Sequence, residues 1–148
     1  MKNYYKFFGM IIVSTITMYV FNYLTTFESG HVIFSETRLY MAILMGATMA
    51  IIMLAFMTHM LKNTKLNIGI VLSSIVIFSI SLFLVRSQML VDDVDYMKAM
   101  IPHHSVAILT SERAELTDPR VRELAEEIIE AQRREIEEMK DLIEELDK

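Results

Sequence analysis

The sequence of 148 residues contains no cysteine and no tryptophan. Without a thiol, the chain forms no disulfide, no thiolate zinc site, no iron–sulfur cluster and no cysteine nucleophile. An excess of positive charge is also missing, since the formal net charge is −5, and this argues against nucleic acid as a partner. Methionine, by contrast, occurs 13 times. Its flexible thioether packs well and is also a ligand for soft metal ions.

Charged residues are absent from three apolar runs, at about residues 7–26, 39–61 and 67–85. Each run has about the 20 residues that a helix needs to cross about 30 Å of hydrocarbon. We therefore predict a transmembrane domain over residues 1–86 and a second, acidic domain over 87–148. The first part has six basic and two acidic residues, a net charge of +4. The second has eight basic and 17 acidic residues, a net charge of −9.

Lysines mark one side of the predicted membrane domain. Lys2 and Lys6 precede the first run, and Lys62 and Lys65 connect the second to the third. Cytoplasmic loops carry such an excess of Lys and Arg. We therefore expect a multi-pass protein of the cell membrane, in contact with the lipid bilayer, whose N-terminus is cytoplasmic and whose C-terminal domain is extracytoplasmic.

The second apolar run carries two stripes. Ala42, Gly46 and Ala50 recur every four residues, a pattern that lets membrane helices approach closely. The other stripe is rich in methionine and consists of Met41, Met45, Met49, Met53 and Met57, followed by His59 and Met60. We interpret this second stripe first as packing or lipid contact. The alternative is a thioether ladder for a soft cation such as Cu(I) or Ag(I).

The acidic part predicts an antiparallel pair of helices. Asp92 or Asp93 is placed to cap the first helix, and Asp118 followed by Pro119 is a strong start signal for the second. The predicted ranges are about 92–116 and 118–146. Such a hairpin buries little core alone, and a second copy would complete a four-helix bundle. The predicted fold is therefore all-α, and we expect a homodimer or a higher homo-oligomer.

A cluster of histidine and methionine lies in the first helix of this hairpin. Met97, Met100 and His104 are spaced i, i+3 and i+7 and so share a helix face, with His103 about 100° around the helix. Thioether with imidazole suits Cu(I) or Ag(I), and imidazole also suits Cu(II) or Zn(II). The spacing therefore predicts a metal site, with ordinary core packing as the alternative.

The second helix of the hairpin carries residues that face this cluster in the predicted seam. Met139 is placed to add a third thioether. Gln132 or Glu135 is placed to accept a hydrogen bond from a ligand imidazole, which would orient that ring.

A set of short motifs in residues 92–146 resembles domain of unknown function 305, DUF305. They are Met100-Ile101-Pro102-His103-His104, Ala107-Ile108, Ala131-Gln132, Glu135-Ile136 and Met139. The resemblance implies a ferritin-like helical fold and a role in copper binding and tolerance, as in periplasmic or secreted members. It implies metal contacts at Met97, Met100, His103, His104 and Met139. The chain departs from the family at Thr110, where members commonly have methionine.

Three functions remain open at this stage. The first is a membrane-anchored protein that binds copper, or silver or zinc, in metal homeostasis. The second is an accessory membrane oligomer without metal, and the third is a metal-conducting oligomer that uses the methionine stripe.

We do not expect an enzyme. Di-iron bundles need Glu three residues before His, but Met100 holds that position, and the one such motif, Glu28 to His31, falls in a loop. Beside Ser105, the sequence shows no acid to orient a histidine.

Overall fold

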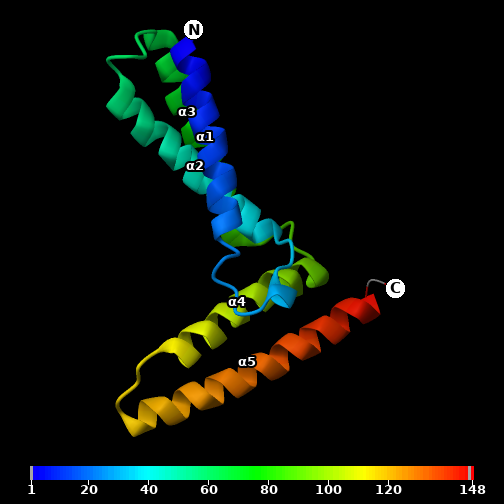
Figure 1. Ribbon diagram of the computed structural model, residues 1–148. Coiled ribbons are helices and arrows are strands. Elements are labelled where there is room, and N and C mark those ends of the chain that lie inside the picture. Colours follow the sequence, from blue (N-terminus) through cyan, green and yellow to red (C-terminus); the bar gives the residue numbers. More distant parts are fainter. Residues whose placement is uncertain (1, 147) are drawn as a thin grey trace. The chain divides into compact units, whose positions relative to one another are not determined.

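The computed structural model describes residues 2–146 and 148, and all regular structure within them is helical (Figure 1). The elements are α1 (Lys2–Phe21), η1, a 3₁₀ turn (Ser29–His31), α2 (Glu36–Met57), α3 (Thr64–Ser87), α4 (Asp93–Arg113) and α5 (Pro119–Leu146). The all-α fold class is thereby confirmed, and the oligomeric bundle stays a prediction. Contacts divide the chain into two units. The apolar unit contains α1, α2 and α3, and the hairpin unit contains the segment Tyr23–Glu36 with α4 and α5.

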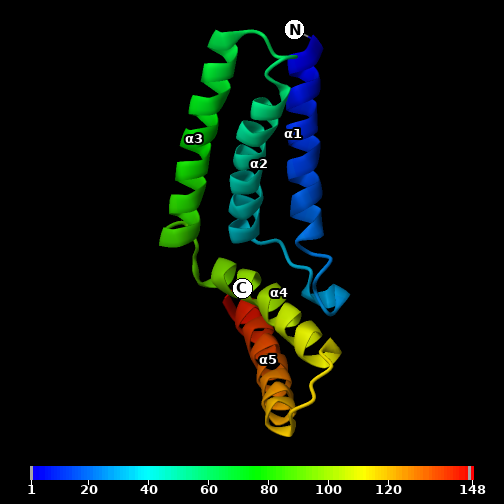
Figure 2. The same ribbon diagram turned by 90° about the vertical axis from the view of Figure 1, so that its left-hand side faces the viewer.

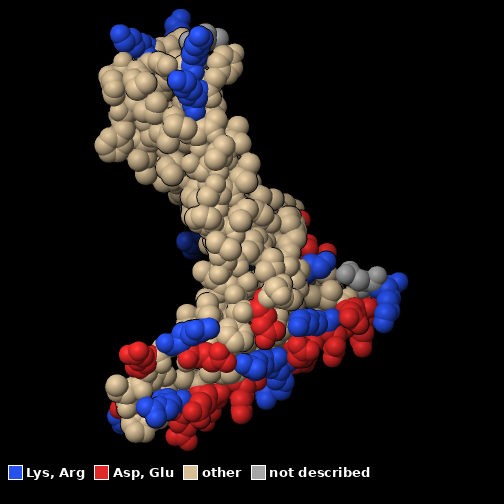
Figure 3. Space-filling model, in the orientation of Figure 1, with Lys and Arg blue, Asp and Glu red and all other residues tan. Residues whose placement is uncertain are grey.

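The apolar unit consists of three helices that are long and apolar enough to cross a membrane (Figure 2). Its core is formed by Phe7, Ala50, Leu54, Leu61 and Ile70. Many other large apolar side chains of these helices point outward and are exposed. Figure 3 shows almost no charge along this unit, whereas Lys and Arg gather at the end that holds the N-terminus. An uncharged helical surface of this kind is what hydrocarbon accepts.

The small-residue stripe of α2 packs inside the unit. Ala42, Gly46 and Ala50 are buried, and a Cβ atom placed on Gly46 would collide with the side chain of Thr15 in α1. The stripe thus lets α1 and α2 approach closely within one chain.

The helices begin and end a few residues away from the predicted bounds, and the largest difference is in the first. The run predicted at 7–26 forms its helix at Lys2–Phe21. The Tyr4 hydroxyl donates to Asn67 Oδ1 at 2.7 Å and accepts the Asn63 N–H at 3.1 Å, which ties the first turn of α1 to the start of α3. These contacts explain the earlier start.

The hairpin unit has the helix starts that the sequence predicted. Asp92 caps α4, because its side chain accepts the Asp95 N–H at 2.8 Å. Asp118 accepts the Arg120 N–H at 2.9 Å, and α5 begins at Pro119. The Arg120 guanidinium, which donates to Asp118 Oδ2 at 2.8 Å, holds the pKa of the Asp118 carboxyl below its usual value, and the Arg120 N–H adds to this lowering.

The core of the hairpin unit draws on a third piece of chain. Ile101 and Ile108 of α4 and Ile136 of α5 are fully buried. Phe27 and Ile33, from the segment Tyr23–Glu36, pack against them. The sequence division at residue 86 leaves this segment in the membrane domain, whereas the contacts join it to the hairpin. The physical reason is that two helices alone leave one side of such a core open to water.

Candidate metal centre

A groove of about 450 Å³ runs between α4 and α5. Its walls combine three thioethers, one imidazole, carboxylates and apolar side chains. The lining residues are Asp93, Tyr96, Met97, Met100 and His104 from α4, and Glu135, Glu138, Met139, Leu142 and Leu146 from α5. The structure therefore brings together four of the five residues predicted as metal ligands.

His104 is the polar centre of this groove. Its Nδ1 atom is buried, and no residue that the structure describes forms a hydrogen bond with it. Glu135 Oε2 lies 3.2 Å away, within ion-pair distance but not aligned for a hydrogen bond. Burial lowers the pKa of the His104 imidazole below its ordinary value of 6.5; Glu135 acts in the opposite direction, and His103 adds to the lowering. The neutral imidazole is the form that binds metal.

His103 and Gln132 do not line the groove. His103 is exposed, its ring centroid lies 6.3 Å from that of His104, and the two rings are tilted by 57°. Consecutive residues of a helix point about 100° apart, so the two imidazoles leave α4 in different directions. Gln132 is half-buried in α5 outside the lining. The roles proposed for these two residues stay predictions.

The donor set of the groove fits a soft ion. The described residues contain no group of three or more His, Cys, Asp or Glu side chains arranged to hold a metal. Met97, Met100 and Met139 instead line the same groove as His104, whose Nδ1 forms no hydrogen bond with the described residues. Sulfur with one imidazole favours Cu(I) or Ag(I), and it is a poor set for hard cations that require oxygen. The residues present therefore fit copper in its reduced state.

The methionine stripe of α2 has different surroundings. Met53 and Met57 pack against the core around Phe7 and Leu54. Met45 and Met49 are half-buried, and the exposed members are Met41, His59 and Met60. The contacts of Met53 and Met57 are those of packing residues, in line with the first interpretation of this stripe.

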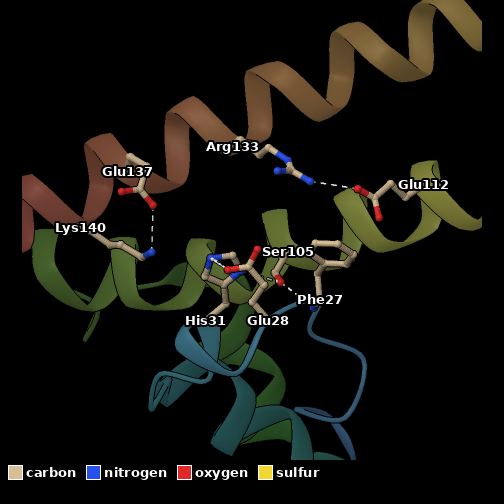
Figure 4. A network of polar contacts seen from close by, with 8 residues as sticks. All are labelled: Phe27, Glu28, His31, Ser105, Glu112, Arg133, Glu137 and Lys140. Atoms are coloured by element: carbon tan, nitrogen blue, oxygen red, sulfur yellow. Dashed lines mark hydrogen bonds and ion pairs between the residues drawn. The ribbon is translucent and has the colours of Figure 1, made fainter.

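A second polar cluster, which was not predicted from the sequence, joins the segment Tyr23–Glu36 to α4 (Figure 4). Ser105 Oγ accepts the Phe27 N–H at 2.7 Å and lies 2.9 Å from His31 Nδ1. Glu28 Oε2 lies 3.8 Å from His31 Nε2. One signal was available: Ser105 occupies the buried face of α4 between Ile101 and Ile108, where an apolar residue is expected.

This cluster supplies the acid and the histidine that the sequence did not show beside Ser105, but its burial argues against catalysis. Ser105 is 0% exposed and His31 is 5% exposed. The hydroxyl is engaged with a backbone N–H and an imidazole and is not presented to a substrate. A nucleophilic serine must reach the substrate atom that it attacks. The cluster is therefore structural.

Comparison with known proteins agrees with the sequence resemblance. The family model "Domain of unknown function (DUF305)" matches residues 92–148, which contain the groove. The chain is 33% identical over 144 residues to "Uncharacterized protein L153" of Acanthamoeba polyphaga mimivirus, and the match covers 93% of each chain. No solved structure matches the chain. The chain is therefore a member of the DUF305 family, with the family domain in its helical hairpin.

Proposed function

We propose that this protein binds a soft metal ion, copper above all, through the groove of its hairpin, and serves metal homeostasis or tolerance at a membrane. The observation that carries the proposal is the buried Nδ1 of His104, which has no hydrogen-bond partner among the described residues and lies in a groove with three thioethers. A buried polar atom that makes no hydrogen bond is costly in a folded protein, and a metal ligand is one role that accounts for it.

In this proposal the ion is the cargo of a binding protein, not the cofactor of an enzyme. In the groove, the ion is held by His104, Met97, Met100 and Met139. The carboxylate of Glu135, beside the imidazole, balances the positive charge of the metal ion. His103, the exposed residue directly before His104 in α4, captures ions from solution. Copper is the preferred cargo, with silver as its close analogue and zinc as a weaker fit to thioether ligands.

We further propose that α1, α2 and α3 cross a cell membrane, with a cytoplasmic N-terminus and an extracytoplasmic hairpin. The support is the length and apolar composition of the helices and the position of Lys2, Lys6, Lys62 and Lys65. This orientation would present the groove to metal outside the cytoplasm.

A second copy of the hairpin remains the proposed partner. Apolar residues of α5 stay exposed in the single chain: Val121, Leu124, Ile128, Leu142 and Leu146. Pairing two hairpins through this face would form a four-helix bundle. The small-residue stripe of α2 is buried within the single chain and is therefore not part of this proposed pairing surface. An accessory oligomer without metal is the alternative function. Conduction along α2 has less support, because Met53 and Met57 pack in a core.

A Cu(I) titration of the purified full-length protein against a competing chromogenic chelator tests the metal proposal. His104→Ala should weaken binding about 100-fold, which equals about 2.7 kcal/mol. His103→Ala should weaken it less, because His103 does not line the groove. His59→Ala, at the end of the α2 stripe, is the matched control and should bind as the unmodified protein does. Equal affinity of the unmodified protein and His104→Ala would refute the site and leave the accessory oligomer.

A further inference from the structure

The segment between α1 and α2 is docked on the same hairpin that holds the groove. Phe27 and Ile33 pack against the buried isoleucine core of α4 and α5. The Arg133 guanidinium lies 5.8 Å from the centre of the Phe27 ring, a cation–π contact from α5. The segment thus forms one wall of the hairpin unit, although its two ends continue directly into α1 and α2.

Ser105 provides the polar contacts that bind this segment to α4. Its hydroxyl oxygen accepts the Phe27 N–H at 2.7 Å, and His31 Nδ1 lies 2.9 Å from the same oxygen (Figure 4). A neutral imidazole with its proton on Nε2 accepts the Ser105 hydroxyl hydrogen and turns Nε2 toward Glu28. Because Ser105 and His31 are buried, breaking these contacts would leave polar groups without water to replace them.

This attachment point immediately follows His104 in α4. One residue turns a helix by about 100°, so the two side chains leave α4 in different directions: Ser105 toward the docked segment and His104 toward the groove. A helix rotates as a unit about its axis. Holding Ser105 against the segment therefore also holds the direction in which His104 points.

We propose that docking of the segment Tyr23–Glu36 on Ser105 and metal binding at His104 are thermodynamically coupled, each favouring the other. The inference rests on the proposed function, because it requires a metal in the groove. Coupling between two sites is reciprocal, so an ion that fixes α4 also favours the docked segment. Since the segment is continuous with α1 and α2, metal binding in the groove then also affects the two helices that the segment connects. Ser105 and His31 act as positioning residues in this scheme.

Hydrogen–deuterium exchange of the full-length protein in lipid nanodiscs tests the coupling, with Ag(I) as a redox-inert probe. Ag(I) should slow amide exchange across residues 23–36 at least threefold, including the Phe27 N–H. Ser105→Ala should abolish that slowing and weaken Ag(I) binding about tenfold. Ser111→Ala, a serine of the same helix outside this cluster, is the matched control and should behave as the unmodified protein.

A second pair of variants keeps the test decisive if Ser105→Ala fails to fold. His31→Ala removes the imidazole and should weaken Ag(I) binding several-fold, whereas His31→Asn keeps a polar atom near the position of Nδ1 and should restore part of the loss. Such a rescue distinguishes positioning from a general loss of packing.

The failures of the two proposals are distinguishable. If Ag(I) binds and protects α4 but leaves exchange of residues 23–36 unchanged, or if the Ser105 and His31 variants bind Ag(I) like the unmodified protein, the coupling is wrong and the metal proposal stands. If the unmodified protein binds no Ag(I), the proposed function fails and the coupling fails with it.

Discussion

The methionines of α2 and those of the hairpin groove share one chemistry but differ in their surroundings. In α2, Met53 and Met57 pack against an apolar core. In the groove, Met97, Met100 and Met139 share the lining with His104, whose buried Nδ1 forms no hydrogen bond with the described residues and lies 3.2 Å from Glu135 Oε2. The two clusters thus share their thioether groups and differ in the polar groups near them. The buried imidazole nitrogen without a hydrogen bond is the feature that distinguishes the groove, and the metal proposal rests on it.

The two units also differ in the small residues that they bury and in the side chains that they expose. The apolar unit hides Ala42 and Gly46 and exposes large side chains such as Phe56. The hairpin unit hides isoleucine and exposes acidic and basic side chains (Figure 3). Water expels large apolar groups, whereas hydrocarbon does not, so helices in lipid associate through close contact of small residues. Under the proposal that α1, α2 and α3 cross a membrane, different forces stabilise the two units.

The largest expected effect compares the two methionine clusters directly. The triple variant Met97→Leu, Met100→Leu, Met139→Leu keeps the side-chain volume but removes sulfur from the groove, and it should weaken Cu(I) binding about 100-fold, about 2.7 kcal/mol. The matched triple variant of the α2 stripe is Met41→Leu, Met45→Leu, Met49→Leu. Its Cu(I) affinity should stay within about twofold of that of the unmodified protein. Competitive Cu(I) titration measures both. An equal loss of Cu(I) affinity in the two triple variants would contradict the proposed difference between the two methionine clusters.

A smaller effect is expected from the contact between helices in the apolar unit. Gly46→Ala places a methyl group against Thr15 and should lower the free energy of unfolding by about 2 kcal/mol. Gly69→Ala, in α3, meets no atom within 4 Å and should keep or raise stability, because alanine favours a helix. Thermal unfolding in detergent measures the difference. Similar destabilisation by both changes would contradict the close approach of α1 and α2.

The smallest expected effect concerns pH and separates the docked segment from the rest of the hairpin. Burial lowers the pKa of His31 below its ordinary value of 6.5, Lys140 adds to the lowering, and Glu28 and Glu137 oppose it. Because the undocked imidazole binds a proton more readily, docking is strongest above about pH 6.5 and weakens as the pH falls below that value. The amide hydrogen–deuterium exchange rate of residues 23–36, corrected for its intrinsic pH dependence, should therefore increase as the pH falls to 5. The increase should be less than tenfold.

The matched variant for this pH effect is His31→Asn, whose side chain does not titrate. Its exchange profile should stay flat over the same range. A pH response that persists in His31→Asn would assign the titration to another group.

Local residue patterns predicted much of the fold. Asp92, Asp118 and Pro119 marked helix starts that the structure shows, since capping depends on neighbours in the chain. The same periodicity placed Met97, Met100 and His104 on one helix face, and the groove confirms that they line a common wall. Whether metal binds there stays a prediction.

The remaining features depend on contacts between distant parts of the chain. Hydropathy alone extended the first helix into residues 22–26, but residues 23–26 belong to the hairpin unit, where the following Phe27 packs against the isoleucine core. The apolar character of such residues is the same whether they meet lipid or an isoleucine core, so sequence alone does not distinguish the two.

By itself, the sequence determined the three apolar helices, the capped acidic hairpin and the helix face that carries the histidine and methionine cluster, because each follows from periodicity, length or capping within one segment. Only the tertiary structure decided that His104 rather than His103 enters the groove, that Gly46 closes on Thr15, and that Ser105 holds the segment between α1 and α2. Those outcomes depend on which surfaces meet, and that is settled by packing between residues far apart in the chain.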